Sequence, residues 1–144
     1  IPFIIRSLYS FFTEFRIHMK KQIFQPAKET IEYYTDERCY ITEICNSPIS
    51  PDGSLAIARV PSGVTTQLHC LNGINETYII IEGEGEVEVD QSLYQVSTGD
   101  QVTIPAGVPQ RVTSLGKNDL RFYCLCVPRF FPGAYVNLEE IKVD

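Results

Sequence analysis

The segment Gly63–Gly83, with the sequence GVTTQLHCLNGINETYIIIEG, contains the pattern that decides the fold of this chain. Apolar and β-branched residues on both sides of Asn72-Gly73 predict two short strands joined by a hairpin turn. In such a hairpin, His69 and Glu76 come to lie side by side on neighbouring strands. An imidazole beside a carboxylate suits divalent Fe, Mn, Zn or Ni. The alternative is a structural role, in which the histidine only completes hydrogen bonds of the strand.

The segment Gly99–Gln110, GDQVTIPAGVPQ, forms a second unit of turn, strand and turn. Gly99-Asp100 predicts a tight turn, and Pro105-Ala106-Gly107 predicts a reversal toward Gln110, because proline fixes φ and glycine accepts a positive φ. Gln110 offers an amide oxygen to a metal or an NH₂ group to a ligand. Its alternative role is to satisfy the polar groups of the turn.

Together, the two segments resemble the paired motifs of the cupin superfamily, in its small single-domain cupin 2 form. The chain has the fixed residues of both motifs at the family's spacing, namely Gly63, His69, Glu76, Gly83, Gly99, Pro105 and Gly107. It departs at two positions, because Leu71 and Gln110 stand where the family has histidine. The resemblance covers about residues 41–128 and implies an all-β fold, a single cupin barrel of the double-stranded β-helix or jelly-roll type. Short predicted strands separated by turns along this stretch agree with such a barrel.

The resemblance further implies a metal site, which in the family usually consists of three histidines and one glutamate. This chain has two histidines in all, His18 and His69, so a three-histidine centre is excluded. One hypothesis is a divalent transition metal held by His69, Glu76 and Gln110, with water in the open positions. The other is a metal-free pocket, in which the same three side chains form hydrogen bonds to a small molecule.

Strand alternation predicts the remaining wall of the pocket, because residues two apart on a strand point to the same side. We expect the following side chains to line it: Gln67, Leu71, Ile80, Val112, Phe122 and Cys124. Tyr78 points the same way as Glu76 and can present its hydroxyl group. Cys124 is either a thiolate ligand or redox group, or simply a small buried apolar residue.

Three functions agree with these residues. The first is an enzyme, a metal-dependent isomerase, epimerase or dioxygenase-like cupin, with Glu76 as ligand or base and Tyr78 as acid or orienting group. The second is a metal-free, non-catalytic module that binds or senses a small molecule. The third is an interaction domain that forms a homodimer, which is compatible with either of the others.

The composition excludes several classes of protein. The chain has 144 residues, the length of one domain, and a net charge of −6. Its longest basic run is Lys20-Lys21, so it lacks the basic surplus of a nucleic-acid-binding protein. Five cysteines without a Cys-x-x-Cys pair predict free thiols and a cytoplasmic location.

Residues 1–19 are predicted to form a helical extension before a cupin domain of residues 20–144. The apolar stripe of this helix consists of Ile4, Ile5, Leu8, Phe11, Phe12 and Phe15. Arg6, Glu14 and Arg16 interrupt the segment, so we expect no membrane span and no signal peptide. Three interpretations of this segment are open. The stripe docks on this domain or on a partner subunit, it lies on a membrane surface, or the segment is an extension upstream of a translation start at Met19. We favour docking.

Overall fold

The computed structural model describes residues 3–139. The chain divides into two compact units, and the boundary falls between Thr30 and Ile31. The first unit contains helix α1 (Phe3–Ile23) and the short 3-10 helix η1 (Ala27–Glu29). Within the described residues, no helix combines the length and the apolar character that a membrane span requires. The second unit contains all the strands and is described from here on as the β domain.

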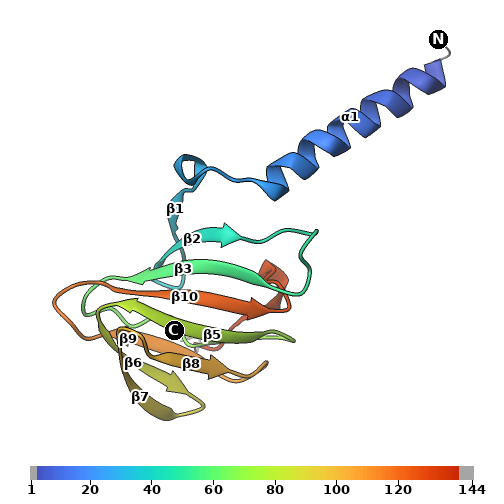
Figure 1. Cartoon of the computed structure of the whole chain (residues 1–144). Helices are drawn as coiled ribbons and strands as arrows, with labels where there is room; N and C mark the ends of the chain where they lie inside the picture. The colour runs from blue at the N-terminus through green and yellow to red at the C-terminus, as the bar shows by residue number, and fades with distance from the viewer. Residues whose placement is uncertain (1–2, 140–144) are drawn as a thin grey trace, which may run out of the picture. The chain divides into compact units, whose positions relative to one another are not determined.

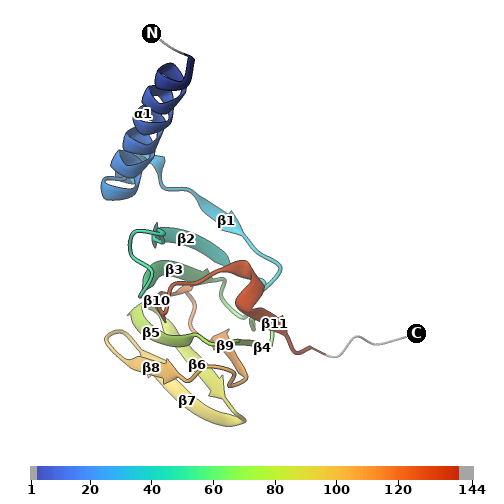
Figure 2. The same ribbon diagram turned by 90° about the vertical axis from the view of Figure 1, so that its right-hand side faces the viewer.

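The β domain consists of two antiparallel sheets (Figures 1 and 2). The first sheet contains, in spatial order, β1 (Glu32–Tyr34), β2 (Tyr40–Cys45), β3 (Ser54–Val60), β10 (Leu120–Val127), β5 (Asn75–Glu82) and β8 (Gln101–Ile104). The second sheet contains β11 (Tyr135–Asn137), β4 (His69–Leu71), β9 (Gln110–Ser114), β6 (Glu84–Val89) and β7 (Ser92–Ser97). The 3-10 helix η2 (Pro132–Ala134) precedes β11, which lies beside β4 in Figure 2. The predicted all-β jelly-roll barrel is therefore confirmed.

The core lies between the sheets, and strand alternation produces it. Along β10, every second side chain is buried, beginning at Leu120, while the others are partly or fully exposed. The neighbouring strands β3 and β5 pair with β10 over nearly their whole length, and their inward side chains form apolar rows from Leu120 to Cys124. The inward face of the first sheet thus presents one half of the barrel core.

Gly83, a fixed residue of the first motif, has a structural role at the end of β5. Its φ is +91°, in the left-handed region that favours glycine. A Cβ atom here would lie 2.8 Å from the backbone oxygen of Asp119. The chain therefore needs glycine where β5 passes the loop before β10.

Two segments of the β domain differ in structure from what their sequences predict. Residues 32–34 have little hydrophobic periodicity, yet they form β1 by pairing with β2, and Arg59 on β3 binds the Glu32 carboxylate and covers the Tyr40 ring at 4.0 Å. The sequence of residues 137–141, NLEEI, predicts a short helical turn. Instead, Asn137 ends strand β11 and Leu138 and Glu139 are not helical, while the rest of that segment lies outside the described residues.

Candidate functional site

The two sheets border a cavity of about 230 Å³ in the β domain, which is partly open to solvent, because the exposed residues Tyr33 and Glu43 belong to its lining. Strands β2, β3, β5 and β10 supply one side of its wall, and β4, β9 and β11 supply the other. The loop between β1 and β2 completes the wall. Most of the lining side chains are apolar or aromatic, so the few polar ones determine what the cavity can bind.

Glu76 is the most deeply buried acid of this wall, with 8% of its surface exposed. It lies on β5 opposite Cys126 on β10, whose thiol is 3.5 Å from Oε2 of the carboxyl group. Burial raises the pKa of Glu76 to about 7, although hydrogen bonds with Cys126, Gln110 and Tyr78 act to lower it. Glu76 therefore changes its charge near neutral pH.

Tyr78 and Gln110 bind to each other across the barrel. The Tyr78 hydroxyl donates a hydrogen bond to Oε1 of Gln110, and both side chains are buried. The Tyr78 ring also packs against Phe122, with the ring centroids 4.5 Å apart. Burial raises the pKa of Tyr78, so its hydroxyl stays protonated and continues to donate.

His69 is held in one orientation on β4. Its ring stacks on Tyr135 of β11 at a centroid distance of 4.6 Å, and Nδ1 lies 2.8 Å from the backbone oxygen of Gln67. A carbonyl oxygen only accepts, so Nδ1 is the donor and Nε2 carries the lone pair in the neutral ring. Burial lowers the pKa of His69, which favours this neutral form.

Glu37 is a site residue that the sequence did not reveal. It belongs to the loop between β1 and β2, and its side chain lines the same cavity as Glu76. Burial raises its pKa to about 7, and the negative charge of Glu76 adds to this. The next residue, Arg38, has a φ of +70°, and its guanidinium binds the Glu139 carboxylate and the backbone oxygen of Thr65. No motif marks Glu37, because this loop geometry alone directs it into the cavity.

Three cysteines contribute to the wall: Cys39, Cys124 and Cys126. Burial raises the pKa of each thiol, to about 12 for Cys39. These groups are protonated at neutral pH, and a thiol is a far weaker metal ligand and nucleophile than a thiolate. The structure thus favours the role of Cys124 as a small buried apolar residue.

Most of the side chains predicted for the site line this one cavity, from both of its sides. These are His69, Leu71, Glu76, Tyr78, Val112, Phe122 and Cys124. Gln110 accepts a hydrogen bond from Tyr78 and is not among the described lining residues. The Gln67 amide oxygen accepts a hydrogen bond from the Tyr135 hydroxyl, at 2.6 Å. Ile80 is buried in the core between the sheets. Gln67 and Ile80 are therefore placed beside the described cavity lining rather than within it.

The donor atoms do not fit a metal centre. Leu71 has no donor atom, and the amide oxygen of Gln110 already accepts a hydrogen bond from Tyr78. Over residues 3–139, no three side chains of His, Cys, Asp or Glu are grouped so that they could hold a metal ion. One imidazole and one carboxyl group are left, fewer than the three protein ligands that catalytic zinc sites provide.

Residues 56–127 match the family model of the cupin domain, Cupin_2. The uncharacterized protein MJ1618 of Methanocaldococcus jannaschii is 32% identical over 100 residues, which cover 68% of this chain and 80% of the relative.

Solved structures give matches at lower identity. Streptomyces Pac13, described as a unique nucleoside dehydratase, has a TM-score of 0.69 at 13% identity, over 83% of this chain and 92% of that chain. The capsular polysaccharide assembling protein CapF of Staphylococcus aureus has a TM-score of 0.67 at 21% identity, again over 83% of this chain. The match spans only 38% of the CapF chain. At these identities, the likeness shows a shared fold.

Proposed function

This chain belongs to the cupin domain family, and we propose that its β domain binds a small organic molecule in the cavity without a metal. The observation that carries the proposal is the carboxyl group of Glu76, buried in the wall of this cavity. A buried carboxyl group costs free energy unless a partner satisfies it. Groups of this kind with a shifted pKa gather at binding and catalytic sites.

The size of the cavity agrees with a ligand of one ring. An apolar cavity of ~150 Å³ in a protein core accommodates benzene. At about 230 Å³, this cavity has room for a ring with one or two substituents. The apolar side chains of Leu71, Val112 and Phe122 would contact the ring, and Glu76 would contact a polar substituent.

Benzyl alcohol is a suitable probe, since it combines one ring with one polar group. We expect it to shift the backbone amide signals of the cavity strands β4, β5 and β10 in a saturable manner, with EDTA present. Ala58→Leu would fill the cavity and abolish these shifts, because Ala58 lines it and is 2% exposed. Ala106→Leu is the matched control, since Ala106 lies in an exposed turn. Shifts that survive Ala58→Leu would refute binding inside the barrel, and shifts that vanish with EDTA would favour the metal hypothesis.

Acid–base catalysis is a second candidate, and the pKa of Glu76 favours it. With a pKa of about 7, this carboxyl group can both accept and return a proton at neutral pH. Tyr78 would orient Gln110 in this role, because its hydroxyl points to Gln110. Such a site suits an isomerase or epimerase that moves a proton on the bound molecule. Exchange of ligand hydrogens for deuterium in D₂O, lost in Glu76→Gln, is the measurement that supports it.

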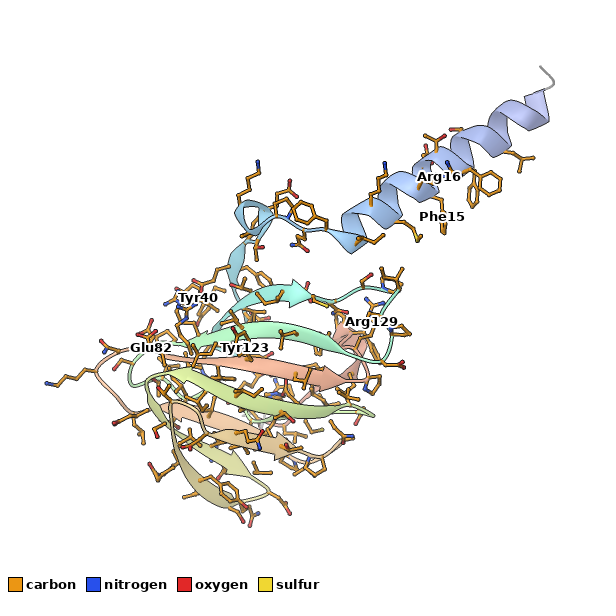
Figure 3. The ribbon with its side chains drawn as sticks, in the orientation of Figure 1. Phe15, Arg16, Tyr40, Glu82, Tyr123 and Arg129 are labelled. Atoms are coloured by element: carbon orange, nitrogen blue, oxygen red, sulfur yellow. The ribbon has the colours of Figure 1, made fainter. Side chains whose placement is uncertain are left out.

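We further propose that the chain forms a homodimer through the outer face of the first sheet. Tyr123, labelled in Figure 3, lies between Ile57 and Ile79 on this face, and the next row contains Leu125, which is 38% exposed. These two rows contain no charged side chain, whereas the row on the other side of Tyr123 contains Arg59, Arg121 and Glu82, so the two uncharged rows would form the contact between copies.

Light scattering tests the dimer. We expect twice the monomer mass for the wild type and for Leu93→Glu, a control on the other sheet, and the monomer mass for Leu125→Glu. A monomeric wild type would refute the dimer.

The cytoplasmic location also stays a proposal, which the five free cysteines support.

A further inference from the structure

We propose that the molecule bound in the cavity carries an ammonium group, which contacts the carboxyl group of Glu76 in a cavity that Glu37 also lines. This inference rests on the proposed function, in which the cavity binds a small organic molecule. It assigns the chemical class of the ligand from the charges, hydrogen-bonding groups and rings of the cavity wall.

The charges of the wall are all of one sign. Glu37, Glu43 and Glu76 contribute carboxyl groups, whereas the described lining contains no lysine or arginine. Two arginines lie next to lining residues: Arg38 binds Glu139, and Arg129 binds the lining residue Asn46, at 2.7 Å from Nε to Oδ1. Among the lining side chains themselves, an anionic ligand would meet no opposite charge, while a cation would meet the carboxyl groups of Glu37 and Glu76.

The hydrogen-bonding groups of the wall include acceptors that no described protein donor uses. Nε2 of His69 carries a lone pair, because Nδ1 donates to the Gln67 backbone, and this ring is 4% exposed. Three of the six lining hydroxyl groups donate to protein atoms: Tyr78 to Gln110, Tyr135 to Gln67, and Thr35 to the backbone oxygen of Cys39. The hydroxyl groups of Ser54 and Thr66 accept hydrogen bonds from backbone N–H groups. An ammonium group offers three donors and no acceptor, so it complements this wall.

Aromatic rings complete the match. Tyr33, Phe122, Phe130 and Tyr135 all line the cavity. The faces of such rings attract cations, and their apolar surface accommodates a hydrocarbon body. A metal ion would use the carboxylates but would leave this surface without a partner. An arylalkyl or alkyl ammonium ion uses both.

Three probes of similar size test the assignment by isothermal titration calorimetry at neutral pH with EDTA present. They are benzylamine, benzyl alcohol and benzoate. We expect benzylamine to bind about tenfold more tightly than benzyl alcohol, the usual effect of a hydrogen bond to a charged partner. We expect benzoate to bind most weakly.

Variants with glutamine in place of glutamate show which carboxyl groups cause the preference for benzylamine. Glu76→Gln and Glu37→Gln should each reduce the preference for benzylamine over benzyl alcohol several-fold. Glu82→Gln, which removes the same charge at the exposed end of β5 (Figure 3), should leave the preference unchanged. If Glu76→Gln fails to fold, Glu37→Gln decides, since Glu37 belongs to a loop.

The outcomes separate the two proposals. Equal binding of benzylamine and benzyl alcohol, or tighter binding of benzoate, would overturn the ammonium assignment and leave small-molecule binding intact. The same holds if Glu82→Gln lowers the preference as much as Glu76→Gln does, because the effect would then come from net charge. Absence of binding for all three probes would overturn the proposed function as well.

Discussion

Replacing Glu76 by glutamine should make the β domain more stable at high pH and leave it nearly unchanged at low pH. Burial raises the pKa of Glu76 from its usual 4.5 to about 7. Between these two values the folded chain keeps a proton that the unfolded chain has released, so the free energy of unfolding falls as the pH rises. At ~1.4 kcal/mol per pH unit, the full effect is about 3 kcal/mol above pH 7 and less than about 1 kcal/mol near pH 5. Glutamine does not ionise and escapes this loss.

Urea unfolding at a series of pH values, followed by tyrosine fluorescence, measures this effect. We expect the stability of Glu76→Gln relative to the wild type to increase by about 2 to 3 kcal/mol from pH 5 to pH 8. Glu82→Gln is the matched control, because Glu82 is exposed on the same strand and its variant should follow the wild type. A difference that does not depend on pH, or one that favours the wild type at pH 8, would refute a protonated Glu76 in the folded chain.

Two further predictions concern backbone conformation and thiol exposure. Gly83→Ala should destabilise the fold by about 2 kcal/mol or more, because alanine disfavours positive φ and its Cβ would crowd the backbone of Asp119. Urea unfolding measures this loss, and an unchanged midpoint would contradict the prediction. Cys45 is exposed and the other four cysteines are buried, so a thiol reagent such as DTNB should modify one cysteine per native chain and all five in urea. Rapid modification of two or more in the native protein would show that the cavity opens.

The fold could be predicted because its turns depend on residues that have few substitutes. Gly83 is needed where β5 meets backbone atoms of the loop before β10, and Gly107 has a φ of +77° in the reversal before β9. Such requirements leave glycine and proline at fixed spacing in the sequence, which is what the motif match detects. Glu76 on β5 and Phe122 on β10 belong to the cavity lining, but the hairpin predicted across Asn72-Gly73 is wrong, because β4 and β5 belong to different sheets.

The site could be predicted only in part, and the reasons are local. Gln67 was expected to point inward with His69, but β4 begins at His69, so strand alternation does not extend back to it. Its side chain instead binds the Tyr135 hydroxyl. Glu37 was missed because a loop has no periodicity, and its direction depends on the positive φ of Arg38 and on contacts with Glu139.

The contact between Arg38 and Glu139 joins residues 101 positions apart in the chain. Together with the stacking of Tyr135 on His69, it means that the cavity wall is assembled from both ends of the β domain. Removal of β11 and of residues 138–139 would therefore take away the ring that stacks on His69 and the carboxylate that binds Arg38 at the same time. The loop that carries Glu37 thus depends on residues at the opposite end of the β domain.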